Sequence, residues 1–204
     1  MLLNYRERCC HMSFYEKQIA SEKIFEGKIF RVTRDKVVLS DGQERPREVV
    51  LHHGGVGIVP VTENGDVLMV RQYRYAVGRE LLEIPAGKLE KDEDPFEAAV
   101  RELSEETGCT AGSWTDLGEM YPTPGYCSET LHIYLATGLR YGEMHLDDGE
   151  LLSVERIPMD EVLGRIMKNE IRDAKTVFGV MKAKEILSGK QEAYDEQNDT
   201  DSGR

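Results

Sequence analysis

Positive charge is scarce in this chain. Its 204 residues include 26 Lys and Arg against 38 Asp and Glu, which gives a formal net charge of −12. Proteins that hold nucleic acid by its phosphates need clustered Lys and Arg, so this composition argues against a nucleic-acid partner. A small anionic substrate would need local arginines and a bound metal to overcome the negative field of the protein.

Long apolar runs are also missing. The sequence contains no stretch of about 18 apolar residues, so it predicts no membrane-spanning helix and no membrane partner. The opening residues, MLLNYRERCCHM, lack the apolar centre of a secretory signal, which favours a cytoplasmic location. A hydrophobic content of 40% and a charged content of 31% are typical of one globular domain at this length.

Cysteine is sparse as well, and its placement predicts no metal or disulfide framework. The four cysteines, Cys9, Cys10, Cys109 and Cys127, lack metal-ligand spacing, so we expect free thiols. The adjacent pair near the start is most simply an incidental feature of a loose terminus. Residues 1–11 differ in character from the rest of the chain, and Met12 is a plausible alternative start; a mass spectrum containing residues 1–11 would contradict this expectation.

The stretch from Gly87 to Cys109, GKLEKDEDPFEAAVRELSEETGC, has the boundary signals of a helix. Asp94 suits the cap position and Pro95 the first helical position. Gly108 supplies the left-handed residue that often ends a helix. Apolar residues recur at helical spacing and predict one apolar stripe, made of Phe96, Ala99, Val100 and Leu103.

Three glutamates of this helix, Glu102, Glu105 and Glu106, project from another side as an acidic patch. A solvated face is one interpretation, because charged faces are common on surface helices. However, Glu102 and Glu106 repel each other at i,i+4 spacing, and Arg101 can pair with Glu105 but leaves the other two uncompensated. A hard divalent cation would relieve this repulsion, so we expect Mg²⁺, with Mn²⁺ as the alternative.

The ordered pattern of this stretch resembles the Nudix box, the signature of hydrolases that act on nucleoside diphosphates linked to another group. Every fixed polar and glycine position is present, and the one departure is Cys109, where the family usually has an aliphatic residue. A buried cysteine behaves as a small hydrophobe, so we expect weaker packing there and intact chemistry. The resemblance covers residues 14–187. It implies an α+β Nudix fold, with a mixed β-sheet sandwiched between helices (α/β/α) and an N-terminal antiparallel β unit.

The resemblance also implies roles for residues in and next to the box. Glu102 and Glu106 match metal ligands of the family, and Ala86 matches a residue that offers its backbone carbonyl. Glu105 matches a further glutamate that helps to hold the metals, and we include it among the catalytic candidates. Arg101 is a catalytic candidate too, with a purely structural role as the alternative.

The rest of the chain alternates between strand patterns and turns. KIFEGKIFRVTRDKVVL alternates apolar and polar residues before a turn at 40–42 and a second run, REVVLHH, which predicts an antiparallel unit. Further strands are predicted in VGIVPV, VLMVRQYRY, ELLEIPA, SWTDLGEMY and ETLHIYLATGL, and closing helices in PMDEVLGRIMKNE and DAKTVFGVMKAKEIL. The predicted domains are a loose extension over 1–13, the β unit over 14–53, the hydrolase domain over 54–187 and a disordered polar tail over 188–204.

A proline-rich segment, Tyr121-Pro122-Thr123-Pro124-Gly125, narrows the substrate. An ordinary turn is one interpretation, because Pro-Gly is a turn signal in any protein. A proline at this distance after the box marks the ADP-ribose pyrophosphatase branch of the Nudix family, which REVVLHHGGVGIVPV and RDAKTVFGVMKAKE also resemble. The implied reaction is metal-dependent hydrolysis of ADP-ribose and related ADP-sugars, releasing AMP and ribose 5-phosphate from ADP-ribose. The alternatives are another nucleoside diphosphate sugar, such as GDP-mannose, or a non-catalytic Nudix module that binds a nucleotide.

The catalytic base is expected in the acidic loop HLDDGE, residues 145–150. In this branch a loop carboxylate activates water or completes the metal set. Asp148 matches the base and Glu150 matches a metal-contacting glutamate, while a solvated acidic loop is the alternative for each.

Substrate contacts are implied by the resemblance at five positions, namely Arg47, Arg74, Glu83, Pro124 and Glu129. Arginine suits phosphate because its fork can bond two oxygens, although a surface charge is the alternative, above all for Arg47. Relatives are homodimers whose N-terminal strands reach the partner's site, so a homodimer is implied. Phe25 or Phe30 would then face the adenine, with a core position as the alternative.

Overall fold

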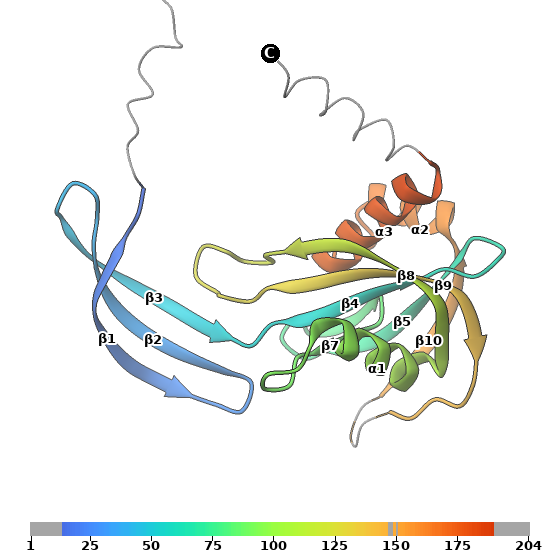
Figure 1. The fold of residues 1–204 in the computed structure, drawn as a ribbon, viewed down its shortest axis with the longest axis horizontal. Helices are drawn as coiled ribbons and strands as arrows, with labels where there is room; N and C mark the ends of the chain where they lie inside the picture. Colours follow the sequence, from blue (N-terminus) through green and yellow to red (C-terminus); the bar gives the residue numbers. More distant parts are fainter. Residues whose placement is uncertain (1–13, 147–148, 150, 190–204) are drawn as a thin grey trace, which may run out of the picture. The chain divides into compact units, whose positions relative to one another are not determined.

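Two compact units make up the part of the chain that the structure, a computed structural model, describes: residues 14–146, 149 and 151–189 (Figure 1). One unit contains the residues up to His52 together with Thr123–Glu129. The other contains His53–Pro122 and the residues from Thr130 onward. The predicted extension over 1–13 lies outside the described residues, as does the predicted polar tail over 188–204 apart from Ser188 and Gly189.

Three antiparallel strands in the order β1-β2-β3 build the first unit: β1 Lys17–Glu26, β2 Phe30–Val38 and β3 Glu44–His52. The predicted antiparallel unit is confirmed, and the first alternating run forms two strands in it, because the chain turns at Gly27 between β1 and β2. At this turn the Gly27 N–H donates to the Phe30 carbonyl (3.0 Å), and a Cβ on Gly27 would lie only 2.8 Å from the Phe25 ring. Glycine therefore suits this turn.

The segment Thr123–Glu129 joins the first unit through hydrogen bonds to β3. The Val50 N–H donates to the Tyr126 carbonyl (2.7 Å), and the Ser128 N–H donates to the Val50 carbonyl (2.9 Å). The His52 N–H donates to the Ser128 hydroxyl (3.0 Å). A proline-rich loop that comes after the box in sequence is thus part of the N-terminal unit, which the sequence did not predict.

The second unit contains two sheets and three helices. The mixed sheet has the order β7-β4-β9-β8, with β4 parallel to β9; its strands are β4 Gly55–Pro60, β7 Ala86–Lys88, β8 Cys109–Met120 and β9 Leu131–Tyr141. The antiparallel sheet has the order β10-β5-β6; its strands are β5 Asp66–Arg74, β6 Arg79–Glu83 and β10 Leu152–Pro158. The helices are α1 Pro95–Thr107, α2 Met159–Met167 and α3 Ala174–Leu187. Among the described residues, no helix has both the length and the apolar character needed to cross a membrane.

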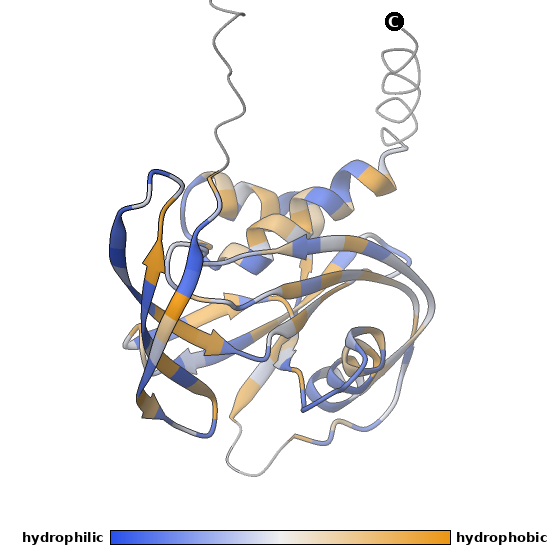
Figure 2. Ribbon diagram, turned by 60° about the vertical axis from the view of Figure 1, so that its left-hand side comes forward, coloured by the Kyte–Doolittle hydropathy of each residue, from blue (hydrophilic) through white to orange (hydrophobic). Residues whose placement is uncertain are grey.

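Buried residues of β4 alternate between two hydrophobic clusters. Val56 and Ile58 pack in the cluster that includes Ala99 and Leu103 of α1, whereas Val59 packs in the cluster that includes residues of α2 and α3. Successive side chains of a strand point to opposite faces, so α1 covers one face of the mixed sheet and α3 the other. Hydrophobic residues are accordingly frequent in the strands of the second unit and in the C-terminal helices (Figure 2). The predicted α/β/α sandwich is confirmed.

Helix α1 buries a face slightly different from the predicted stripe. Ala98, Ala99 and Leu103 are buried, whereas the predicted stripe members Phe96 and Val100 remain 42% and 40% exposed. Phe96 instead packs edge-on against the rings of Trp114 and Tyr134, at centroid distances of 5.5 and 5.8 Å; Cys109, at the start of β8, is fully buried. The three-residue strand β7 and the strand β10 were absent from the prediction.

Candidate active site

Helix α1 begins and ends where the sequence predicts. The Asp94 carboxylate accepts hydrogen bonds from the N–H groups of Phe96 (2.9 Å) and Glu97 (3.1 Å), and Pro95 occupies the first helical position. Gly108 ends the helix with φ of +67°, and its N–H donates to the Ser104 carbonyl (2.9 Å). These two caps fix the register of the helix and thereby the direction of its glutamates.

Arg101 binds three carboxylates at once. Its Nε lies 3.0 Å from Glu93 Oε1, and its Nη1 lies 2.8 Å from Glu102 Oε1 and 2.9 Å from Glu105 Oε2. The expectation that Arg101 compensates only Glu105 is therefore wrong. The hydrogen bond with Glu93 is the largest of the influences that raise the pKa of Arg101, so this guanidinium stays charged.

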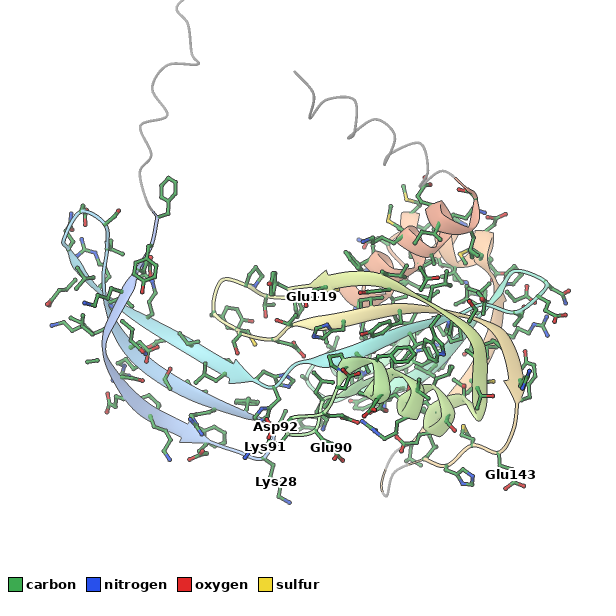
Figure 3. All side chains as sticks on the ribbon, viewed as in Figure 1. Lys28, Glu90, Lys91, Asp92, Glu119 and Glu143 are labelled. Atoms are coloured by element: carbon green, nitrogen blue, oxygen red, sulfur yellow. The ribbon has the colours of Figure 1, made fainter. Side chains whose placement is uncertain are left out.

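Glu93 connects the loop before α1 to the helix. Its carboxylate accepts the hydrogen bond from Arg101 and also one from the Glu90 N–H (2.8 Å). The bond from Arg101 is the main reason that the pKa of Glu93 is lowered. This loop contains Glu90, Lys91 and Asp92, which are labelled in Figure 3. The pair between Glu93 and Arg101 therefore connects the loop to the helix.

Glu102 and Glu106 both meet the short strand β7. A Cβ on Gly87 would lie 1.7 Å from Glu102 Oε1, so only glycine leaves room for this carboxylate. Glu106 is 2% exposed, and its Oε2 accepts a hydrogen bond from the Ala86 N–H (2.9 Å). The interpretation of a solvated acidic face is therefore wrong, because the side chains of Glu102 and Glu105 are also only 12% and 28% exposed.

The donor set around β7 fits a hard divalent cation. Carboxylates of Glu102, Glu105 and Glu106 and the carbonyl of Ala86 offer only oxygen, the ligand type that Mg²⁺ prefers. Within the described residues, no group of three or more His, Cys, Asp and Glu side chains is already gathered as a metal cluster. In this arrangement Arg101 contacts two of the three glutamates, and the backbone of β7 contacts Glu106.

Arg74 and Glu83 form a second charged group in the same unit. Arg74 Nε lies 2.9 Å from Glu83 Oε1, and its Nη2 lies 2.7 Å from Glu83 Oε2, a two-pronged ion pair. Glu83 is 1% exposed and also contacts the ammonium of Lys175, a residue that the sequence did not single out. The bond to Glu83 is the largest influence that raises the pKa of Arg74, and the charge of Glu106 contributes, so Arg74 lies within electrostatic reach of α1.

Three predicted substrate contacts, Arg47, Pro124 and Glu129, lie in the first unit. Arg47 forms a two-pronged pair with Glu16, at 2.8 and 2.6 Å, and both side chains are partly exposed. Pro124 follows Thr123, whose carbonyl accepts a hydrogen bond from the Cys127 N–H (3.1 Å) in a turn. Glu129 Oε1 lies 3.6 Å from His52 Nδ1, a neighbour that the sequence did not predict.

The two residues predicted in the acidic loop, Asp148 and Glu150, lie outside the described residues. The start of this loop is described, and the His145 N–H donates to the Glu105 carbonyl (3.1 Å). The described start of this loop, which follows β9, is therefore bonded to the last turn of α1. Glu143, labelled in Figure 3, belongs to the same connection between β9 and β10.

The fold and the box define a Nudix hydrolase. The NUDIX domain family matches residues 51–178, and the nucleoside diphosphate sugar hydrolase N-terminal domain matches residues 16–50. The chain therefore belongs to the Nudix family.

Similar proteins agree with this assignment. The chain is 39% identical to an ADP-ribose pyrophosphatase of Bacillus subtilis, over 88% of this chain and 99% of that protein. It is 41% identical to a methanol dehydrogenase activator of Bacillus methanolicus, over 82% of this chain and 91% of that protein. A crystal structure of an ADP compounds hydrolase superposes with a TM-score of 0.76 at 24% identity, covering 87% of this chain and 97% of that one, which confirms the fold.

Proposed function

We propose that this chain hydrolyses the pyrophosphate bond of ADP-ribose and related ADP-sugars, releasing AMP and ribose 5-phosphate from ADP-ribose. The observation that carries the proposal is the packing of Glu102 against Gly87 and the bond from Ala86 to Glu106, which hold two glutamates at one short strand. The relative from Bacillus subtilis, which this chain matches over nearly its whole length, bears the name of this activity.

A divalent cation, Mg²⁺ or alternatively Mn²⁺, would be held by Glu102, Glu106 and the Ala86 carbonyl, with Glu150 as a further ligand. When bound, such a cation neutralises phosphate charge, polarises the phosphoryl group and lowers the pKa of an attacking water. Burial of Glu106 keeps bulk water away from this carboxylate, and its bond from the Ala86 N–H fixes its direction. The ligands are thus oriented before substrate arrives.

Arg101 serves this site by orienting carboxylates. Its guanidinium faces Glu102 and Glu105 from one side and holds Glu93 of the preceding loop from the other. Glu105 supports the ligand set through this contact. Asp148 is the proposed base that accepts the proton of the attacking water, since the described start of its loop is bonded to the last turn of α1, which carries the glutamates.

Substrate binding is assigned to arginines and to the proline-rich segment. Arg74 is proposed to contact the pyrophosphate, because its position beside Glu83 is fixed and it lies within reach of the charge of Glu106. Glu83 orients Arg74. Contacts from the first unit are proposed for a further set of residues: Arg47, Pro124 and Glu129.

A homodimer is proposed through the first unit. Strand β1 is exposed along its whole length, including Ile19, Ile24 and Phe25, which are 45%, 46% and 52% exposed. The rings of Phe25 and Phe30 pack at a tilt of 46° with a centroid distance of 5.7 Å, and both side chains are substantially exposed. Apolar side chains displayed by a three-stranded sheet support burial against a second copy, where these rings would face the adenine.

We also propose a cytoplasmic location and no nucleic-acid partner, the latter because of the net charge of −12.

Product analysis tests the substrate. Purified protein with Mg²⁺ is incubated separately with ADP-ribose and GDP-mannose, and the release of AMP and GMP is quantified by chromatography. We expect AMP and ribose 5-phosphate as products and a clear preference in kcat/KM for ADP-ribose. A strong preference for GDP-mannose would assign the chain to another nucleoside diphosphate sugar, and binding without any product would make it a non-catalytic nucleotide-binding module.

A further inference from the structure

A buried ion network lies where α3 begins. Lys175, in the first turn of α3, is only 8% exposed. Its ammonium contacts Glu83 Oε2 and lies 3.0 Å from Asp173 Oδ2. Lysine is almost never buried to this degree unless its charge is paired, so these two carboxylates are the reason that it is tolerated here.

Glu83 is shared between two cations. Its Oε2 receives both the Lys175 ammonium and Arg74 Nη2, while its Oε1 receives Arg74 Nε. Burial raises the pKa of Glu83, but the bonds from Arg74 and the charge of Lys175 outweigh it, so the pKa is lowered and the carboxylate stays ionised. Two cations and two carboxylates, counting Asp173, make the network neutral as a whole.

The network also holds the segment between β6 and Ala86 in place. Asp173 Oδ2 accepts from the Thr176 N–H (3.0 Å) and the Thr176 hydroxyl (2.6 Å), and that hydroxyl oxygen accepts from the Ile84 N–H (2.9 Å). Thr176 is completely buried. The first turn of α3 is therefore bonded to both Glu83 and Ile84, just before Ala86.

Lys175 and Arg74 share the negative charge of Glu83. The Arg74 side chain is 39% exposed, although two of its nitrogens bond Glu83. Without Lys175, the network would carry a net negative charge, and Arg74 alone would compensate Glu83. Glu83 would then hold the Arg74 guanidinium more strongly, and less of its positive charge would be left for a pyrophosphate that approaches the exposed part of Arg74.

We propose that Lys175 is a positioning residue for substrate binding, because it shares the charge of Glu83 and so leaves the Arg74 guanidinium available to the anionic pyrophosphate. This inference rests on the proposed function, in which Arg74 contacts the substrate. Lys175 itself touches no substrate atom. Its effect passes through Glu83 and Arg74.

A double-mutant cycle between positions 175 and 74 tests this role. Lys175→Met should raise KM for ADP-ribose about tenfold and leave kcat within about twofold, because Glu83 then takes up more of the Arg74 charge and the metal ligands are untouched. In an Arg74→Met background, Lys175→Met should raise KM no further, since the residue through which it acts is gone. Lys175→Arg, which keeps the charge, should recover most of the affinity.

Lys184→Met is the matched control. Lys184 lies on the same helix and pairs with Asp160, and both side chains are exposed, so its loss should leave KM and kcat unchanged. Circular dichroism and thermal melting ensure that only folded variants are compared, and Lys175→Gln replaces Lys175→Met where the latter does not fold. The dissociation constant of ADP-ribose in EDTA, by calorimetry, should rise in parallel with KM.

Additive effects of the two substitutions on KM would overturn the inference, and so would a fall in kcat at constant KM. Failure of the proposed function looks different, because the unmodified protein would then neither bind ADP-ribose nor release AMP. In that case the cycle is measured on whichever nucleoside diphosphate sugar is hydrolysed, since its pyrophosphate is the same. A chain that binds none of them would overturn the role of Lys175 in substrate binding as well.

Discussion

We expect Gly87→Ala to lower the rate of catalysis strongly while changing the stability of the fold little. The added Cβ would lie 1.7 Å from Glu102 Oε1 and 1.9 Å from its Cδ, whereas real Cβ atoms essentially never approach another atom within 3.0 Å. The carboxylate must therefore retreat by more than about 1 Å. Displacement of a ligand by about 1 Å costs on the order of 10²-fold in rate, so we expect kcat/KM to fall by at least about that factor.

Stability should change little in the same variant. Gly87 has no left-handed φ, and the displaced atoms belong to the end of a flexible side chain, so the free energy of unfolding should fall by only about 1 kcal/mol. Urea unfolding monitored by circular dichroism measures this quantity, and AMP release from ADP-ribose at saturating Mg²⁺ measures the rate. The matched control is Gly164→Ala in α2, where a Cβ meets nothing within 4 Å; its activity should equal that of the unmodified protein.

Undiminished activity in a folded Gly87→Ala variant would contradict this expectation. Such a result would mean that the reaction does not need the Glu102 carboxylate at this place beside β7. Loss of folding would instead show that the packing of Glu102 on Gly87 stabilises the unit, and Glu102→Gln would then measure the catalytic contribution without the added Cβ.

Two further predictions concern the ion networks. Arg101→Gln removes the shared partner of Glu93, Glu102 and Glu105, so the free energy of unfolding in urea should fall by about 1–3 kcal/mol. Arg101→Lys should recover only part of this loss. Equal stability of the two variants and the unmodified protein would contradict the shared role of Arg101. Because the pKa of Glu83 is lowered below its ordinary value of 4.5, its stabilisation is present above that value and is lost as pH falls through the lower folded value. Lys175→Met should therefore move the midpoint of acid unfolding to higher pH, with Lys184→Met unchanged; identical midpoints for Lys175→Met and the unmodified protein would contradict the pairing.

Local signals in the sequence were sufficient for α1 and for most strands. Asp94 and Gly108 act through atoms a few residues away, so the limits of the helix follow from the chain itself. The acidic patch could be predicted as a group for the same reason, because helical geometry alone brings Glu102, Glu105 and Glu106 together.

Contacts between distant residues could not be predicted in this way. Lys175 follows a helix cap and has the sequence context of an exposed lysine, and only its meeting with Glu83 explains its burial. The segment Thr123–Glu129 belongs to the N-terminal unit because its backbone bonds Val50, and no local pattern encodes that pairing. The strand β7 has three residues, too few for a periodic signal.

Glu106→Gln is the decisive variant for the proposal that the glutamates held at β7 bind the metal used to hydrolyse ADP-ribose. Glu97→Gln is the matched control, because Glu97 is an exposed glutamate on the same helix. With Mg²⁺ and ADP-ribose, we expect Glu106→Gln to lower kcat for AMP release by about 10²-fold or more while the fold is retained, and Glu97→Gln to match the unmodified protein. Full activity of a folded Glu106→Gln variant would show that the buried carboxylate is not a metal ligand of the reaction.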